Sequence, residues 1–261
     1  MSGLSSFYGL DPDLNSGLSA LASRPNEGIF FWIVYPKISR MTSAIIVAAG
    51  SGSRMGFDKL LAPLGNGPVF LHSLRAFQDC PDIDEIVLVV SANRGDSVKR
   101  IAEASGLSKL KHCVTGGTER HLSVWEGLKA MSRLTDFVAV HDGARPLIHP
   151  SQISRCVSRA METGAAASAR PVSETLKRAD DTLRVTSSVD RSGLWLMETP
   201  QVFARHLLVS AYESVLRDGV IVTDEVSALG HIGHDVWLVE NTAPNPKITW
   251  PADLALAERL L

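Results

Sequence analysis

The sequence predicts an α/β protein whose mostly parallel central sheet carries helices on both faces, and two observations support this prediction. From Thr42 onward, short apolar runs rich in β-branched residues alternate with segments whose apolar residues repeat at helical spacing. Such alternation is typical of parallel strands joined by helices. The chain has 261 residues, of which 45% are hydrophobic and 21% charged, enough for one well-buried α/β domain or two small ones.

Six strands are expected from the apolar runs. They cover residues 44–48, 85–90, 112–114, 137–140, 165–169 and 236–239. Six helices are expected between and after them, at residues 69–78, 97–104, 121–131, 151–163, 205–218 and 251–261. In the first helix Leu71, Leu74 and Phe77 fall on one face, and in the last Pro251 occupies the first turn, where proline is favoured.

One segment departs from this alternation and predicts a β-hairpin. Residues 175–179 and 183–187 are strand-like and flank the turn Asp180-Asp181-Thr182. Because an isolated two-stranded hairpin is marginal in water, we expect it to pack against something, most economically the same hairpin of a second subunit. The alternative is a loose hairpin on the surface of a monomer.

The loop after the first strand predicts a phosphate site. Residues 50–56 read Gly-Ser-Gly-Ser-Arg-Met-Gly, and Lys59 follows. Glycines let successive backbone N–H groups converge on an anion, while Arg54 and Lys59 would neutralise its charge. A dinucleotide fingerprint is excluded because Met55 stands where its third glycine belongs, and a P-loop is excluded because Gly56 is followed by Phe57.

Two further loops follow predicted strands, where ligands of parallel sheets bind. Gly116-Gly117 opens the helix that holds Ser123, although a turn and helix cap explain it equally well. Asp142 follows the strand at 137–140 and is a candidate ligand of Mg²⁺, which takes one or two carboxylates plus substrate phosphates. An aspartate that begins a turn is the alternative, and His141 is expected to be a packing residue.

Later loops add cations and a helix cap. Thr223 or Asp224 is expected to cap a helix, and Lys247 taken alone would be a solvated surface charge. Together with Arg54 and Lys59, Arg191 and Lys247 make four cations on loops. That is enough for two phosphate-bearing ligands if the fold brings them together.

Composition excludes several classes of protein. A formal net charge of −2 gives no electrostatic reason to expect a nucleic-acid partner. Cys80, Cys113 and Cys156 lack the spacing of a disulfide framework or zinc site, so we expect buried, inert thiols in a reducing cytoplasm.

The first forty residues differ from the rest of the chain. Residues 29–35 form an apolar burst far shorter than the roughly 20 residues that span a bilayer, and no basic secretory signal precedes it. No membrane association is therefore expected. We expect residues 1–40 to be an N-terminal extension, either disordered or upstream of a natural start at Met41, and residues 41–261 to form the functional domain.

A set of short segments then occurs in a characteristic order. They are residues 48–55, 116–117, 119–120, 123–124, 141–146, 175–178, 189–195, 199–201, 223–225 and 247–249. With this set the chain from Met41 onward resembles the 2-C-methyl-D-erythritol 4-phosphate cytidylyltransferase family. The first segment alone is shared by many nucleotidyltransferases, whereas the whole set is specific.

The resemblance implies a Rossmann-like nucleotidyltransferase fold with a protruding β-arm at about residues 171–193 that forms a homodimer. It also implies transfer of CMP from CTP to 2-C-methyl-D-erythritol 4-phosphate, with Mg²⁺ or another divalent cation as cofactor. The products would be 4-diphosphocytidyl-2-C-methyl-D-erythritol and pyrophosphate, a step of non-mevalonate isoprenoid synthesis.

Site residues follow from the resemblance by position. The catalytic residues would be Arg54, Lys59 and Lys247. CTP would be bound by Ala48, Ala49, Gly50, Ser51, Gly52, Gly117, Thr118, Ser123, Asp142 and Gly143, and the metal by Asp142. Methylerythritol phosphate would be bound by Arg145, Thr175, Arg191, Thr199 and Thr223, with Thr175 and Arg191 reaching the substrate of a partner subunit.

Two departures from the family pattern adjoin the catalytic lysines. Asp58 precedes Lys59 where the family often has proline, which is expected to change the stiffness of the loop. Pro246 precedes Lys247 where the family usually has isoleucine, and it removes a backbone donor.

Three rival functions remain open. A cytidylyltransferase for another polyol phosphate, such as ribitol 5-phosphate, would share the nucleotide half of the site. An NAD-dependent reductase would share the α/β alternation, but Met55 and the lack of an acidic residue at the end of the strand at 85–90 oppose it. A non-catalytic nucleotide-binding module would not need Arg54, Lys59, Asp142 and Lys247 together.

Overall fold

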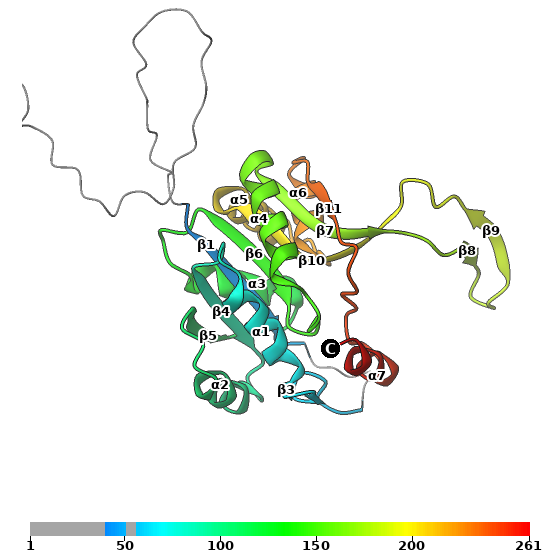
Figure 1. The fold of residues 1–261 in the computed structure, drawn as a ribbon. Coiled ribbons are helices and arrows are strands. Elements are labelled where there is room, and N and C mark those ends of the chain that lie inside the picture. Colours follow the sequence, from blue (N-terminus) through cyan, green and yellow to red (C-terminus); the bar gives the residue numbers. More distant parts are fainter. Residues whose placement is uncertain (1–39, 51–55) are drawn as a thin grey trace, which may run out of the picture. The chain divides into compact units, whose positions relative to one another are not determined.

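Seven strands form the central sheet of the computed structural model, which describes residues 40–50 and 56–261 (Figure 1). Their order across the sheet is β11-β7-β10-β6-β1-β4-β5. All neighbours pair in parallel except β10, which runs antiparallel to β6 and β7. The strands are β1 (Thr42–Ala48), β4 (Glu85–Val90), β5 (Leu110–Thr115), β6 (Phe137–Asp142), β7 (Ala165–Pro171), β10 (Trp195–Ala204) and β11 (Trp237–Glu240). The prediction of a mostly parallel α/β sheet is confirmed.

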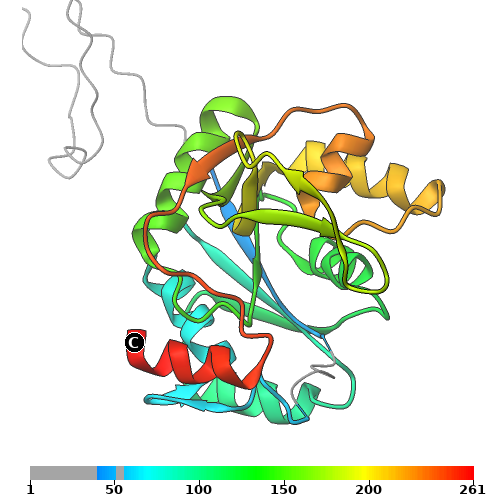
Figure 2. The same cartoon turned by 90° about the vertical axis from the view of Figure 1, so that its right-hand side faces the viewer.

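Helices cover both faces of the sheet (Figure 2). One face packs against α1 (Val69–Asp79), α2 (Gly95–Ala104) and α4 (Pro150–Thr163), and the other against α3 (Arg120–Ala130), α5 (Arg205–Arg217) and α6 (Glu225–His231). In β1, Ile45 faces the second layer while Ile46 faces the first, the period-2 alternation of a strand buried on both sides.

The last helix, α7 (Pro251–Leu260), belongs to a smaller apolar cluster. That cluster joins it to Ile248 and to the short strand β2 (Pro63–Leu64), which pairs with β3 (Gly67–Pro68). None of the described helices is long and apolar enough to cross a membrane.

Every predicted strand and helix is present, with ends shifted by no more than two residues. Four elements were not predicted: the two-residue strands β2 and β3, the strand β10, which contains Pro200 and several polar residues, and the short helix α6. Asp224 is the N-cap of α6, where its side chain accepts a hydrogen bond from Ser227 N, so the prediction of a helix cap is confirmed. The predicted N-terminal extension, Arg40 excepted, lies outside the described residues.

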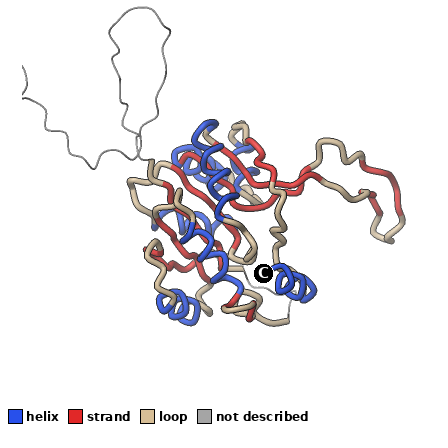
Figure 3. Tube along the Cα trace, viewed as in Figure 1, coloured by secondary structure: helices blue, strands red, loops and turns tan. Residues whose placement is uncertain are grey.

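The predicted hairpin is present and projects from the domain (Figures 1 and 3). Its strands are β8 (Leu176–Ala179) and β9 (Val185–Val189), paired antiparallel from Leu176 opposite Val189. We call residues 171–193 the arm. Apolar side chains on it face solvent within this chain, with Leu183 87% and Val185 60% exposed.

The cysteines do not all behave as predicted. Cys80 and Cys156 are buried, but Cys113 is only half-buried, so the prediction of three buried thiols is wrong for this residue. The reason is that Cys113 lies on β5, the edge strand of the sheet, which has a neighbouring strand on one side only.

Chain order across the sheet reverses beside β1. From β1 the chain moves outward through β4 to β5, and it then returns to the other side of β1 as β6. Ligands of open parallel sheets bind at such a switch point, outside the carboxyl ends of the strands. The arm leaves the sheet from the carboxyl end of β7, at this same edge of the sheet.

Candidate active site

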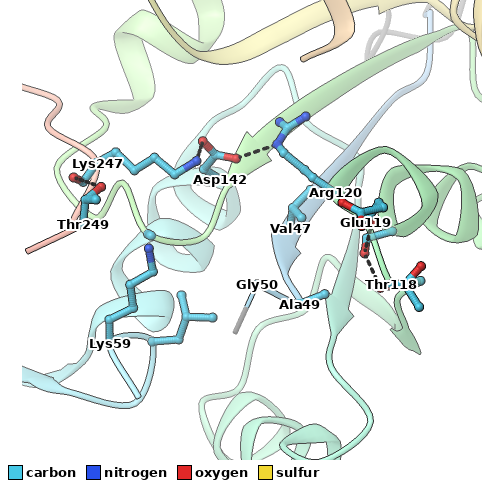
Figure 4. Close-up of a pocket in the computed structure, with 14 residues that line it drawn as sticks. Val47, Ala49, Gly50, Lys59, Thr118, Glu119, Arg120, Asp142, Lys247 and Thr249 are labelled. Carbon is cyan, nitrogen blue, oxygen red and sulfur yellow. Dashed lines mark hydrogen bonds and ion pairs between the residues drawn. The ribbon is translucent and has the colours of Figure 1, made fainter. Parts of the chain in front are cut away.

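A cavity of about 370 Å³ opens at the carboxyl ends of β1, β5 and β6 (Figure 4). It lies at the switch point between β1 and β6, where the fold predicts a ligand site. The residues that line it are Val47, Ala49, Gly50, Lys59, Leu60, Gly117, Thr118, Glu119, Arg120, Ser123, Asp142, Ala144, Lys247 and Thr249.

The fold brings many of the predicted site residues together in this cavity. Those that line it are Ala49, Gly50, Lys59, Gly117, Thr118, Ser123, Asp142 and Lys247. Other predicted residues do not line it: Ala48, Gly143, Arg145, Thr175, Arg191, Thr199 and Thr223. Ser51, Gly52 and Arg54 lie outside the described residues.

Asp142, at the end of β6, is the electrostatic centre of the site. Its carboxylate oxygens lie 3.1 Å from Arg120 Nε, 2.8 Å from Lys247 Nζ and 3.6 Å from Arg145 Nε. Burial would raise the pKa of Asp142, but the charges of Arg120, Lys247 and Arg145 outweigh it and hold the pKa well below its usual range. Asp142 is therefore a carboxylate at any physiological pH.

Arg120 is a site residue to which the sequence analysis assigned no role. Its guanidinium forms a bidentate pair with the fully buried Glu225, at 2.6 and 3.1 Å, and Tyr212 Oη donates to the same carboxylate at 3.0 Å. Burial would lower the pKa of Arg120, but the charges of Glu225 and Asp142 raise it well above its usual value. The Glu119-Arg120 segment of the family pattern could have indicated Arg120. Its partner Glu225 could not be inferred from local sequence, because it is 105 residues away.

Lys59 and Lys247 approach the cavity from opposite ends of the chain. Lys59 is 9% exposed, and its ammonium donates to the carbonyl of Ile248 at 2.8 Å. Ile248 N in turn donates to Ala144 O at 2.8 Å, which holds the segment after Lys247 against the turn after β6. Pro246 does not keep Lys247 from the site, because the lysine reaches Asp142.

The segment that leads to Lys247 is held by a buried carboxylate. Glu198 is 4% exposed, and its Oε2 accepts hydrogen bonds from Asn241 Nδ2 at 2.9 Å and Asn245 Nδ2 at 3.1 Å. Arg145 donates to the carbonyl of Asn245 at 2.8 Å, so its guanidinium ties this segment to the turn after β6. We call Glu198, Asn241 and Asn245 the Glu198 clamp.

The glycine pair after β5 is required by close packing. A Cβ added to Gly116 would lie 2.6 Å from Ser123 Oγ and 2.8 Å from Ala49 Cβ, and one added to Gly117 would lie 2.4 Å from Leu122 Cβ. Ser123 is 1% exposed and donates to the carbonyl of Glu119 at 3.0 Å, which stabilises the first turn of α3. The pair thus brings the β5–α3 turn against the end of β1.

Four other predicted residues lie away from the cavity, in three different places. Thr223 is exposed before α6. Thr199 is buried behind Asp142, where its Oγ1 accepts from Asp142 N at 3.0 Å and lies 2.9 Å from His141 Nδ1. Thr175 and Arg191 lie exposed on the arm, where Arg191 donates to a backbone carbonyl of the arm.

His141 is fully buried against Phe77, with ring centroids 4.9 Å apart, so its prediction as a packing residue is confirmed. Burial lowers the pKa of His141 to about 4. Its imidazole is therefore neutral near pH 7 and adds no cation to the site.

The donor set of the cavity suits a cation that takes most of its ligands from substrate. Asp142 and Glu119 are the carboxylates that line it, and in the described part of the chain no three His, Cys, Asp or Glu side chains gather into a metal cage. Mg²⁺ usually keeps several waters and binds one or two carboxylates together with phosphate oxygens. The ionised Asp142 fits that role.

Comparison with known proteins identifies the family. A family model described as IspD, 2-C-methyl-D-erythritol 4-phosphate cytidylyltransferase, matches residues 42–261. The 2-C-methyl-D-erythritol 4-phosphate cytidylyltransferase of Alkaliphilus oremlandii is 40% identical over 223 residues, which cover 84% of this chain and 94% of that protein. The Bacillus velezensis enzyme of the same name is 38% identical over 220 residues, covering 83% of this chain and 94% of its own length.

Solved structures agree with the sequence comparison. The crystal structure of 4-diphosphocytidyl-2C-methyl-D-erythritol synthase from Anaerococcus prevotii has a TM-score of 0.75 and 30% identity, covering 85% of this chain and 96% of that one. The Thermus thermophilus 2-C-methyl-D-erythritol 4-phosphate cytidylyltransferase has a TM-score of 0.69 and 30% identity, covering 85% and 98%. This chain belongs to the 2-C-methyl-D-erythritol 4-phosphate cytidylyltransferase family, as the order of its motifs predicted.

Proposed function

We propose that this chain transfers CMP from CTP to 2-C-methyl-D-erythritol 4-phosphate and releases pyrophosphate. The observation that carries the proposal is the convergence of Lys59, Lys247 and Asp142 on one cavity beside the glycine-rich end of β1. These residues lie far apart in the sequence, so their meeting at a ligand-binding edge supports a site built for phosphates.

The chemistry needs positioning and positive charge rather than a strong base. A phosphate oxygen of methylerythritol phosphate forms a bond to the α-phosphorus of CTP, and the bond from that phosphorus to the bridging oxygen of pyrophosphate breaks. The nucleophile is already an anion, so no proton has to be removed from it. The obstacle is the approach of two anions, which cations held in place can overcome.

In this mechanism Lys59 and Arg54 bind the triphosphate and stabilise charge at the α-phosphorus, while Lys247 aligns the reacting phosphates. Asp142 keeps Lys247 oriented through their 2.8 Å ion pair. Asp142 would also hold Mg²⁺ or another divalent cation, which when bound would neutralise phosphate charge.

The two substrates occupy different parts of the site in this proposal. Backbone N–H groups of residues 49–52 hold the phosphates of CTP, with Ala48 and Gly143 adjoining them. Gly117, Thr118 and Ser123 bind the cytosine. Methylerythritol phosphate lies toward Arg145, Thr199 and Thr223.

The arm would complete the site of a second subunit. Its exposed Leu183 and Val185 are apolar groups that a hairpin of a partner could cover. In such a homodimer Thr175 and Arg191 would reach the methylerythritol phosphate bound to the partner. We further propose that residues 41–261 form the catalytic domain and that the enzyme is cytoplasmic, which its three free cysteines support.

Release of pyrophosphate from CTP and Mg²⁺ tests the function, with methylerythritol 4-phosphate and ribitol 5-phosphate compared as acceptors. We expect release with the first acceptor and none with the second. Release with ribitol 5-phosphate alone would keep the mechanism but overturn the substrate. Light scattering on the same preparation tests the homodimer, and a monomer at assay concentration would overturn it.

A further inference from the structure

Arg94 joins both ends of the glycine-rich loop, although it lies outside the cavity. It stands between β4 and α2 and is 9% exposed. Its Nη2 donates to the carbonyl of Ala49 at 3.2 Å and also to that of Gly50, where β1 ends. Its Nη1 donates to Asp58 Oδ1 at 2.8 Å, directly before Lys59. One guanidinium therefore contacts the residues on each side of residues 51–55.

The hydrogen bonds of Arg94 show that it positions other groups and is not itself a ligand residue. Its Nε donates to Ser91 Oγ at 2.7 Å, so four of the five N–H donors of its guanidinium are engaged within the protein. The one remaining donor cannot make the bidentate contact by which arginine frequently binds phosphate, and Arg94 does not line the cavity.

At the end of β1, Arg94 orients the backbone. In a trans peptide the C=O and N–H groups point to opposite sides. Because the carbonyl of Ala49 is turned toward Arg94, the N–H of Gly50 in the same peptide points away from it. Gly50 lines the cavity, so this arrangement leaves its N–H available to a phosphate.

Beyond the loop, Arg94 bonds Asp58, the residue directly before Lys59. Asp58 Oδ1 accepts from Leu60 N at 3.1 Å as well as from Arg94, so this carboxylate bonds the backbone just beyond Lys59. An aspartate supplies by hydrogen bonding the stiffness that a proline would otherwise give to the residue before Lys59.

We propose that Arg94 is a positioning residue that holds the backbone of Gly50 and, through Asp58, the ammonium of Lys59 in the geometry that binds the triphosphate of CTP. The inference rests on the proposed function, because it assigns CTP to this cavity. Loss of Arg94 should therefore weaken the binding of CTP but not that of methylerythritol phosphate, because Arg94 holds residues assigned to CTP.

Calorimetric titration with CTP and Mg²⁺, followed by steady-state kinetics with each substrate varied, tests the proposal on Arg94→Gln. We expect CTP affinity and kcat/KM for CTP to fall roughly 10- to 100-fold, the loss of hydrogen bonds to a charged group. The KM for methylerythritol phosphate should not change. Arg94→Lys should not recover the loss, because one ammonium cannot span Asp58 and two carbonyls.

Arg100→Gln is the matched control. Arg100 lies on α2, is exposed and donates to a carbonyl of its own helix, so this variant should match the wild type. Asp58→Asn tests the contact between Arg94 and the residue before Lys59. The loss of CTP affinity in the double variant should be smaller than the sum of the losses in Asp58→Asn and Arg94→Gln, because the two residues share one contact. If Arg94→Gln folds poorly, Asp58→Asn carries the test alone.

Unchanged CTP affinity in folded Arg94→Gln, or equal changes in both KM values, would overturn the inference. If the wild type binds CTP but no acceptor supports pyrophosphate release, the proposed reaction fails while the calorimetric test of Arg94 stands. A wild type that does not bind CTP would overturn both.

Discussion

Replacing Glu198 by glutamine should loosen the segment that carries Lys247. The change preserves the size of the side chain but removes its charge and one of its two acceptor oxygens. Both Asn241 and Asn245 donate to a single carboxylate oxygen of the 4% exposed Glu198. If the glutamine placed its NH₂ group at the position of Oε2, the NH₂ groups of Asn241 and Asn245 would lose their acceptor.

The magnitude follows from these contacts. Hydrogen bonds to a buried charged group contribute about 1.5–3 kcal/mol each, and an unsatisfied buried donor costs about 1–3 kcal/mol. The glutamine oxygen can keep part of the pairing by rotation, so we expect a loss of roughly 2–4 kcal/mol in the free energy of unfolding. Arg170, 3.7 Å from Glu198 and 46% exposed, should add little.

Urea unfolding followed by circular dichroism measures this loss, and kcat measured on the same preparation reports the position of Lys247. A misplacement of about 1 Å can cost about 100-fold in rate, so kcat should fall together with stability. Glu240→Gln is the control, because Glu240 is exposed on β11 and close in sequence. A free energy of unfolding for Glu198→Gln within about 0.5 kcal/mol of the wild type, as for ordinary surface variants, would show that the Glu198 clamp does not hold this segment.

Other predictions concern the cations that we propose as catalytic, the pH dependence of stability, and the thiols. Lys59→Ala and Arg54→Ala should each lower kcat about 10²- to 10³-fold, the loss expected for a charge-stabilising group, and a change below about tenfold would remove that residue from its role. Burial lowers the pKa of His141 from 6.5 to about 4. The free energy of unfolding should therefore fall by about 3 kcal/mol as the pH drops from 6.5 to 4, because only the unfolded chain gains the proton. If the free energy of unfolding of His141→Gln depends on pH in the same way, this account of His141 is wrong. Iodoacetamide should modify the half-buried Cys113 before the buried Cys156, whose pKa burial raises to about 12, and mass spectrometry of tryptic peptides shows the order.

Elements whose apolar residues repeat with a regular period could be predicted from local sequence. Residues 85–90 form a strand buried at every position, and α1 presents its apolar face as the spacing predicts. Lys59 and Asp142 could also be predicted to lie at the cavity, because ligands of a parallel sheet bind outside the carboxyl ends of its strands. These signals are local, since a few neighbouring residues are enough to produce them.

β10 and the contacts that hold the residues of the cavity appear only in the folded structure. β10 lacks a simple apolar pattern because it buries polar side chains: Glu198 bonds Asn241 across 43 residues, and Thr199 bonds Asp142 across 57. A buried polar group is stable only when it is hydrogen-bonded, and here the partners come from distant segments. Arg94 depends in the same way on residues 36–45 positions away. Local sequence suggests which residues act in this protein, but the folded chain decides what holds them in place.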